Sequence, residues 1–238
     1  MNEYHISVLM KLLLSHLIAD FLLQKDLSIK KKKEKKGSSR WLYMHGGVAG
    51  LLAYVFVAQW SELWILPVVA LSHMAIDSVR YMKEDSLLWF SLDQMAHVLV
   101  MLLVWYFLLP SDTFGQAGYM LADAKIWILL TAYFLILFPA GSFIGKATER
   151  WKKEIEPSNY EGLEKAGLWI GRMERFLILT FILDHEYSLV GLLIASKSIL
   201  RFNADRKAGE YILIGTLASL TISVGVGLIT LWLLNMKS

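Results

Sequence analysis

Long apolar runs separated by short polar segments dominate the chain. A transmembrane α-helix needs about 20 residues to cross roughly 30 Å of hydrocarbon. Runs near this length predict spans at residues 6–24, 41–59, 63–80, 87–109, 124–144, 166–183, 187–201 and 211–234. The first and seventh runs are weak candidates, because each carries several polar residues. The pattern predicts an all-α fold: a polytopic transmembrane helical bundle of about eight spans.

Basic residues are concentrated in alternate connections between these spans. The connections 25–40, 80–86, 146–165 and 201–207 hold eight, two, five and three Lys or Arg residues, whereas 60–62, 110–123 and 184–186 hold none. The positive-inside rule therefore places the basic connections in the cytoplasm and both termini outside. We interpret the run Lys30–Lys33 as an orientation signal that also attracts anionic lipid head groups. No aromatic residue lies within the connection 25–40, so we predict no nucleic-acid partner.

Composition agrees with a membrane protein. Hydrophobic residues make up 56% of the 238 residues and the mean hydropathy is +0.48, whereas soluble domains are about 45–50% apolar. The absence of cysteine excludes disulfides and thiolate metal ligands. We expect one integral-membrane domain over residues 1–238, with a four-helix half at 1–109 and a C-terminal helical half at 110–238.

Histidine and aspartate recur at four-residue spacing in the first four predicted spans. This spacing places both members of a pair on one helix face. The pairs are His16 and Asp20, His73 and Asp77, and Asp93 and His97, and His45 lies one turn into the second predicted span. With alternating span directions and a rise of about 1.5 Å per residue, all of them fall in one layer of the inner half of the membrane.

A layer of this kind is costly unless its members face one another or a wet cavity, because a charged residue costs about 2.5–3.5 kcal/mol at a span centre. Neutral imidazoles and carboxylates are ligands for a divalent cation, with zinc expected and manganese or iron as alternatives. The expected metal ligands are His16, His45, His73, Asp77 and His97. Asp20 and Asp93 are the expected catalytic residues, acting as a base or orienting an imidazole. A proton or ion relay and structural polar contacts between helices are the alternatives.

A second polar group lies at the predicted cytoplasmic side of the C-terminal half. Its expected substrate-binding residues are Arg172, Arg175, Lys197 and Arg201. Guanidinium and ammonium groups bind phosphate or an anionic lipid head group. The alternative is that these cations extend to the head-group region and that Glu174 forms a structural pair with an arginine.

These motifs resemble an uncharacterised bacterial membrane family, the domain of unknown function 3307 family. The resemblance rests on the paired motifs His16-x-x-x-Asp20-Phe21-x-x-Gln24, Met44-His45, His73-x-x-x-Asp77 and Asp93-Gln94-x-x-His97. The segments 171–175, 195–202 and 211–216 look like its C-terminal part. Similar His/Asp pairs occur in a group of predicted membrane-bound metal-dependent hydrolases.

The resemblance and the cluster together lead to one main hypothesis. We expect a multi-pass protein of the bacterial inner membrane that acts as a metal-dependent hydrolase on a lipid-like or anionic substrate, such as a lipid phosphate, at the cytoplasmic leaflet. An ion- or proton-coupled transporter that uses the same cluster is one alternative. A non-catalytic membrane scaffold or sensor, in which the cluster is structural, is the other.

Overall fold

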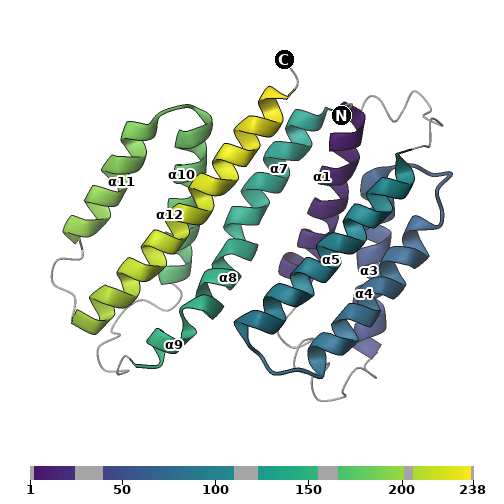
Figure 1. Ribbon diagram of the computed structural model, residues 1–238, viewed down its shortest axis with the longest axis horizontal. Helices are drawn as coiled ribbons and strands as arrows, with labels where there is room; N and C mark the ends of the chain where they lie inside the picture. Colours follow the sequence, from purple (N-terminus) through teal and green to yellow (C-terminus); the bar gives the residue numbers. More distant parts are fainter. Residues whose placement is uncertain (1–2, 25–39, 110–122, 155–165, 201–205, 237–238) are drawn as a thin grey trace. The chain divides into compact units, whose positions relative to one another are not determined.

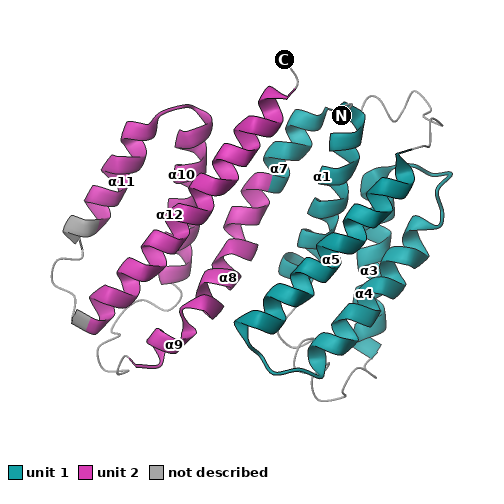
Figure 2. Ribbon diagram, in the orientation of Figure 1, with its two compact units in different colours: residues 1–131 teal, residues 132–238 magenta. Residues whose placement is uncertain are grey.

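The structure is a computed structural model that describes residues 3–24, 40–109, 123–154, 166–200 and 206–236. Within these ranges every regular element is a helix (Figure 1), which confirms the predicted all-α class. The basic run Lys30–Lys33 and the predicted anion-binding residue Arg201 lie outside the described residues. The chain divides into two compact units, Met1–Thr131 and Ala132–Ser238 (Figure 2).

Unit 1 is a bundle of long helices. It contains α1 (Glu3–Ile18), the π-helical turn η1 (Ala19–Leu23), α3 (Arg40–Val57), α4 (Ile65–Tyr81), α5 (Leu87–Leu108) and the first half of α7 (Ala124–Leu137). Ser86 caps the start of α5, because its side chain accepts a hydrogen bond from the Trp89 backbone N–H at 3.3 Å. The Thr131 hydroxyl donates to the Met10 carbonyl at 3.2 Å, which ties α7 to α1.

The apolar core of unit 1 shows that neighbouring helices run in opposite directions. It combines the N-terminal halves of α1 and α4 with the C-terminal halves of α3 and α5. Its fully buried members are Val8, Leu12, Ala53, Ile65, Val69, Met101, Val104 and Leu108. The remaining halves of the same helices therefore meet at the other end of the unit. These halves carry the histidine and aspartate pairs.

Two glycines bring α3 and α4 unusually close. A Cβ atom on Gly50 would lie 2.5 Å from the Leu66 carbonyl oxygen and 2.9 Å from the Ala70 Cβ. One turn earlier, a Cβ on Gly46 would overlap the Met74 side chain and lie 2.9 Å from the Ala70 carbonyl oxygen. Small residues four positions apart are a typical way for membrane helices to approach closely. His45 immediately precedes this contact, so the glycines set its distance from α4.

Unit 2 contains the second half of α7, α8 (Pro139–Ala147), α9 (Glu149–Lys152), α10 (Ala166–Leu183), α11 (Tyr187–Leu200) and α12 (Arg206–Asn235). Pro139 separates α7 from α8, because proline lacks the backbone N–H that would continue the helix. Gly227 of α12 packs against α10, where an added Cβ would lie 2.7 Å from the Ile182 Cγ2. The core between α7 and α10 includes Ile136 and Leu179.

Four described segments are long and apolar enough to cross a membrane: Glu3–Leu23, Leu87–Leu108, Ala124–Ala147 and Lys207–Asn235. Eight spans were expected. Of the other helices, α10 carries three charged residues, and α4 and α11 have only 17 and 14 residues. The eight-span arrangement with both termini outside stays a prediction.

The distribution of side chains in α5 agrees with a membrane protein. Many of its large apolar residues are exposed, with Met95 at 67% and Phe107 at 66%, while His97 on the same helix is 1% exposed. A large exposed apolar surface is unfavourable in water and favourable in lipid. Together with the four apolar segments, this polar-inside arrangement indicates a membrane protein.

Candidate metal centre

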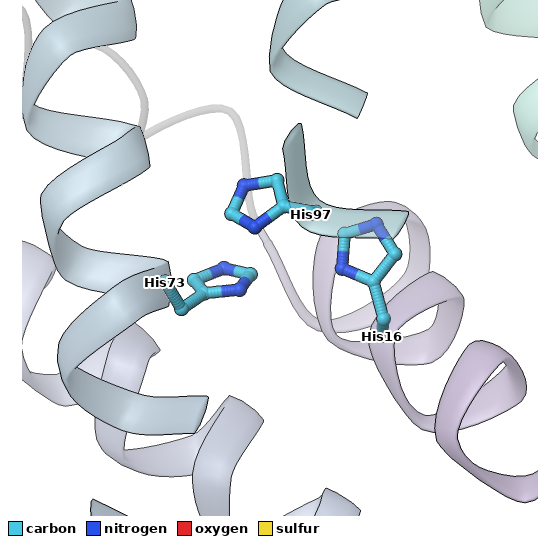
Figure 3. A group of neighbouring side chains, drawn as sticks. All are labelled: His16, His73 and His97. Atoms are coloured by element: carbon cyan, nitrogen blue, oxygen red, sulfur yellow. The ribbon is translucent and has the colours of Figure 1, made fainter. Parts of the chain in front are cut away.

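The histidine and aspartate pairs of unit 1 gather into one buried cluster. Figure 3 shows three of its imidazoles, which come from α1, α4 and α5 and face a common space. His16, His73 and His97 are at most 2% exposed, and His45 and Asp77 are 7% and 3% exposed. The cluster forms because alternating helix directions place the C-terminal halves of α1 and α4 beside the N-terminal halves of α3 and α5.

Three of these side chains form a tight triangle. Asp20 Oδ1 lies 3.1 Å from His73 Nε2 and 3.3 Å from His45 Nε2, and the two Nε2 atoms are 3.0 Å apart. For a tetrahedral zinc site with metal–ligand bonds of about 2.0–2.1 Å, neighbouring ligand atoms are about 3.3 Å apart. The triangle thus has the edge lengths of one face of a zinc coordination sphere.

Asp20 reaches this position from a π-helical turn. The turn η1 covers Ala19–Leu23 and follows α1 directly. Single π-helical turns are rare and frequently occur at functional sites. His16, one turn earlier, keeps its Nδ1 at 4.0 Å from Asp20 Oδ1, so both members of this pair contribute to the cluster.

A second group of donors lies around His97. Its Nε2 atom is 3.7 Å from Asp93 Oδ1 and 3.8 Å from Asp77 Oδ1. The other oxygen of Asp77, Oδ2, is 3.9 Å from His45 Nε2. The Asp77 carboxylate therefore lies between the triangle and the His97 group, and the rings of His73 and His97 have centroids only 4.1 Å apart.

Gln94 holds the carboxylates in place. Its amide nitrogen donates to Asp20 Oδ2 and to Asp93 Oδ2, both at 3.1 Å, and its amide oxygen lies 3.3 Å from His16 Nε2. A hydrogen-bonding partner of this kind fixes the orientation of ligand side chains and tunes their basicity. Gln94 belongs to the motif Asp93-Gln94-x-x-His97, but its spacing alone does not predict this role.

Several polar atoms of the cluster are buried without a hydrogen-bond partner in the part of the chain that the structure describes. They are His16 Nδ1, His73 Nδ1, Asp93 Oδ1 and His97 Nε2. Each unpaired buried polar group costs about 1–3 kcal/mol, so such atoms call for a partner. A bound cation would supply one for Asp93 Oδ1 and His97 Nε2. The donor chemistry, nitrogen and carboxylate oxygen without sulfur, fits a divalent metal.

The structure brings together all seven residues predicted for the metal and catalytic roles. Three sets of three are placed to hold a metal ion: His16 with His73 and His97, Asp20 with His45 and His73, and Asp20 with Asp93 and His97. Asp20, predicted as a catalytic residue, lies at the centre of the donors. The predicted division into ligands and catalytic residues stays a prediction, as does the identity of the metal.

The residues predicted to bind an anion lie in unit 2. Arg172, Arg175 and Lys197 line a cavity of about 430 Å³, formed mainly by α8, α10 and α12, with Lys197 contributed by α11. Lys197 forms an ion pair with Glu174 at 2.5 Å. Arg175 is 5% exposed, and its Nε donates to the Ile136 carbonyl at 2.6 Å. Glu174 therefore pairs with Lys197. The alternative given for this group of residues expected its partner to be an arginine.

The match with a known sequence family lies within unit 1. Residues 8–119 match the family described as a protein of unknown function (DUF3307), a stretch that includes the whole His/Asp cluster. This match supports an uncharacterised family and assigns no activity. Neither a curated protein nor a solved structure matches the chain. The resemblance of the segments 171–175, 195–202 and 211–216 to the same family stays a prediction.

Proposed function

We propose that the protein is a metal-dependent hydrolase of the bacterial inner membrane that acts on a lipid-like or anionic substrate at the cytoplasmic leaflet. The observation that carries this proposal is the triangle of Asp20, His45 and His73, whose 3.0–3.3 Å edges match a coordination sphere. The buried unpaired atoms of Asp93 and His97 beside it support the same conclusion. Zinc is the expected metal, with manganese or iron as alternatives.

The residues of the cluster divide the work of hydrolysis. His45, His73 and Asp20 would hold the cation, which when bound lowers the pKa of a water to about 7 and polarises the scissile group. Hydrolysis joins the water oxygen to the carbonyl carbon or phosphorus and breaks the bond from that atom to the leaving group. Asp93, whose Oδ1 is unpaired, accepts the water proton and returns it to the leaving group.

The location at the cytoplasmic leaflet follows from the charge pattern. If the protein has the predicted eight spans with both termini outside, the positive-inside rule supports a cluster in the inner half of the membrane. An ester, amide or phosphodiester of a membrane lipid is the substrate class that this depth favours.

Purified protein in detergent or nanodiscs, incubated with inner-membrane phospholipids, tests the proposal. We expect lipid cleavage products by mass spectrometry, loss of cleavage on chelation and recovery on adding Zn²⁺ or Mn²⁺. Asp93→Asn should abolish cleavage, whereas His185→Gln, which changes a histidine outside the cluster, should not. Metal binding without any chelator-sensitive lipid turnover would argue against the hydrolase.

The transporter alternative requires a polar route from the cluster through the rest of unit 1. The opposite end of this unit contains an apolar core that includes Val8, Leu12, Val69 and Val104, although Ser7, Lys11 and Gln59 are also buried there. An ion pathway through this packing would cross several fully buried aliphatic side chains. The hydrolase is therefore the better supported of the two proposals.

A further inference from the structure

We propose that the cluster is built for two metal ions that share carboxylate ligands. This inference rests on the metal binding in the proposed function. The first ion would be held by His45 Nε2, His73 Nε2 and Asp20 Oδ1. The second would be held by His97 Nε2 and Asp93 Oδ1, which are 3.7 Å apart. In this two-metal centre Asp93 is a metal ligand, and this replaces the role as proton acceptor that it has when a single ion is bound.

Asp77 and Asp20 are placed as bridging ligands. Asp77 directs Oδ2 toward His45 Nε2 at 3.9 Å and Oδ1 toward His97 Nε2 at 3.8 Å, one oxygen for each group. Asp20 belongs both to the set with His45 and His73 and to the set with Asp93 and His97. Two-metal hydrolytic sites have ions about 3.5–4 Å apart. The 4.1 Å between the ring centroids of His73 and His97 shows that the two groups are adjacent.

The number of donors also exceeds the need of one ion. A zinc site uses four ligands, and this cluster offers seven buried or nearly buried histidine and aspartate side chains. A single ion in the triangle would leave Asp93 Oδ1 and His97 Nε2 without a partner. One divalent ion would also leave one of the three carboxylate charges uncompensated, which is costly away from water. A second ion gives Asp93 and His97 a partner and compensates the remaining carboxylate charge. The two ions together then carry more positive charge than the three carboxylates carry negative charge, which favours an anionic substrate.

Manganese titration of chelator-stripped protein in detergent tests this inference. We expect two Mn²⁺ per chain by elemental analysis after desalting, with an electron paramagnetic resonance spectrum of a magnetically coupled pair. His45→Gln removes a donor of the first group and Asp93→Asn one of the second. Each variant should retain one Mn²⁺ with the spectrum of an isolated ion. His185→Gln, the matched control, should behave like wild type.

The outcomes separate the two proposals. One Mn²⁺ per wild-type chain with an isolated-ion spectrum would overturn the two-metal centre and leave the metal-dependent function standing. No Mn²⁺ bound, with the same result for Zn²⁺, would overturn both. If either variant fails to fold, the wild-type stoichiometry and spectrum decide the question without it.

A separate observation in unit 2 carries a second inference: we infer that the cavity around Arg175 binds a phosphate group. Arg175 donates from Nε to the Ile136 carbonyl and from Nη1 to the Ser219 hydroxyl at 3.2 Å. Its Nη2 has no hydrogen-bond partner among the described residues, although the side chain is 5% exposed. A buried guanidinium with free donors is suited to phosphate oxygens, which it binds through two parallel hydrogen bonds.

The surroundings leave room and positive charge for that group. A Cβ on Gly141 would lie 3.0 Å from Arg175 Nη2, and one on Gly171 would lie 3.2 Å from Nη1, so these glycines keep the guanidinium uncrowded. The basic residues of the cavity are Lys152, Arg172, Arg175 and Lys197, and its acidic residue is Glu174. Glu174 is already paired with Lys197. The cavity therefore keeps an excess of positive charge around Arg175.

Inorganic phosphate and phosphatidic acid serve as probes that distinguish a free phosphate from a lipid head group. We expect thermal stabilisation by one or both, at least tenfold weaker binding in Arg172→Gln, and none in Arg175→Gln. Arg150→Gln, an arginine of α9 outside the cavity lining, is the matched control. Stabilisation by phosphatidic acid in nanodiscs but not by inorganic phosphate would identify a lipid head group. No effect of either probe on wild type, or equal effects in Arg175→Gln and Arg150→Gln, would overturn the site.

Discussion

Gly50→Ala should open the metal centre without removing any of its donor atoms. The added Cβ would lie 2.5 Å from the Leu66 carbonyl oxygen, which is backbone and cannot rotate away. Ordinary carbon contacts are about 3.5–4.0 Å, so α3 must move from α4 by about 1 Å. His45 is carried on α3 and His73 on α4, and their Nε2 atoms are now 3.0 Å apart.

The size of the effect follows from this displacement. An increase of about 1 Å takes the His45–His73 separation to about 4 Å, beyond the roughly 3.3 Å that a tetrahedral site with 2.0–2.1 Å bonds requires. Disturbing the support of metal ligands typically costs 10–100-fold in affinity. Overpacking a helix contact costs about 1–3 kcal/mol in stability, partly offset by the higher helix propensity of alanine, worth up to about 1 kcal/mol.

Competition between the protein and a fluorescent chelator for Zn²⁺ measures the affinity, and thermal unfolding in the same detergent measures stability. Gly47→Ala is the matched control, since nothing lies within 4 Å of its added Cβ. It should leave the affinity unchanged and raise stability slightly. Equal Zn²⁺ affinity in Gly50→Ala, Gly47→Ala and wild type would refute the reasoning that helix approach sets the site.

Three further results are expected. Gln94→Leu should weaken Zn²⁺ binding about 10–100-fold, because it removes the amide that orients two carboxylates. Titration against the same fluorescent chelator measures this affinity, and an affinity equal to that of wild type would contradict the prediction. Gly227→Val should destabilise the protein by about 1–3 kcal/mol through overpacking against Ile182, whereas Gly215→Ala, with nothing within 4 Å, should be nearly neutral in thermal unfolding. Removal of metal by a chelator should lower the melting temperature, and adding Zn²⁺ back should restore it. The physical reason is that a ligand at 100 times its Kd stabilises the folded state by about 2.7 kcal/mol. An unchanged melting temperature would count against a bound metal.

The gathering of the cluster was predictable because two simple rules combine. Four-residue spacing fixes the helix face, and alternating span direction fixes the depth at which His16, His45, His73 and His97 meet. The approach of α3 to α4 was also readable in principle, since Gly46 and Gly50 form a small-residue pair four positions apart. In the last helix, Gly227 also packs closely against a neighbour, whereas nothing lies within 4 Å of an added Cβ on Gly215.

Other features had no comparable signal. Nothing in the sequence around Ala19–Leu23 distinguishes a π-helical turn from the α-helix that precedes it, yet this turn carries Asp20. Lys11 is 2% exposed, and its ammonium lies 5.1 Å from the Trp127 ring centroid. That cation–π contact joins residues 116 positions apart, so local patterning contains no sign of it.

X-ray absorption spectroscopy of the protein as purified, at the edge of whichever metal it carries, tests the central claim most directly. We expect nitrogen and oxygen scatterers, at about 2.0–2.1 Å if the metal is zinc. The outer-shell scattering of at least two imidazoles should be present, reduced in His73→Gln and unchanged in His185→Gln. Absence of bound metal, or a shell of oxygen ligands without imidazole, would contradict it.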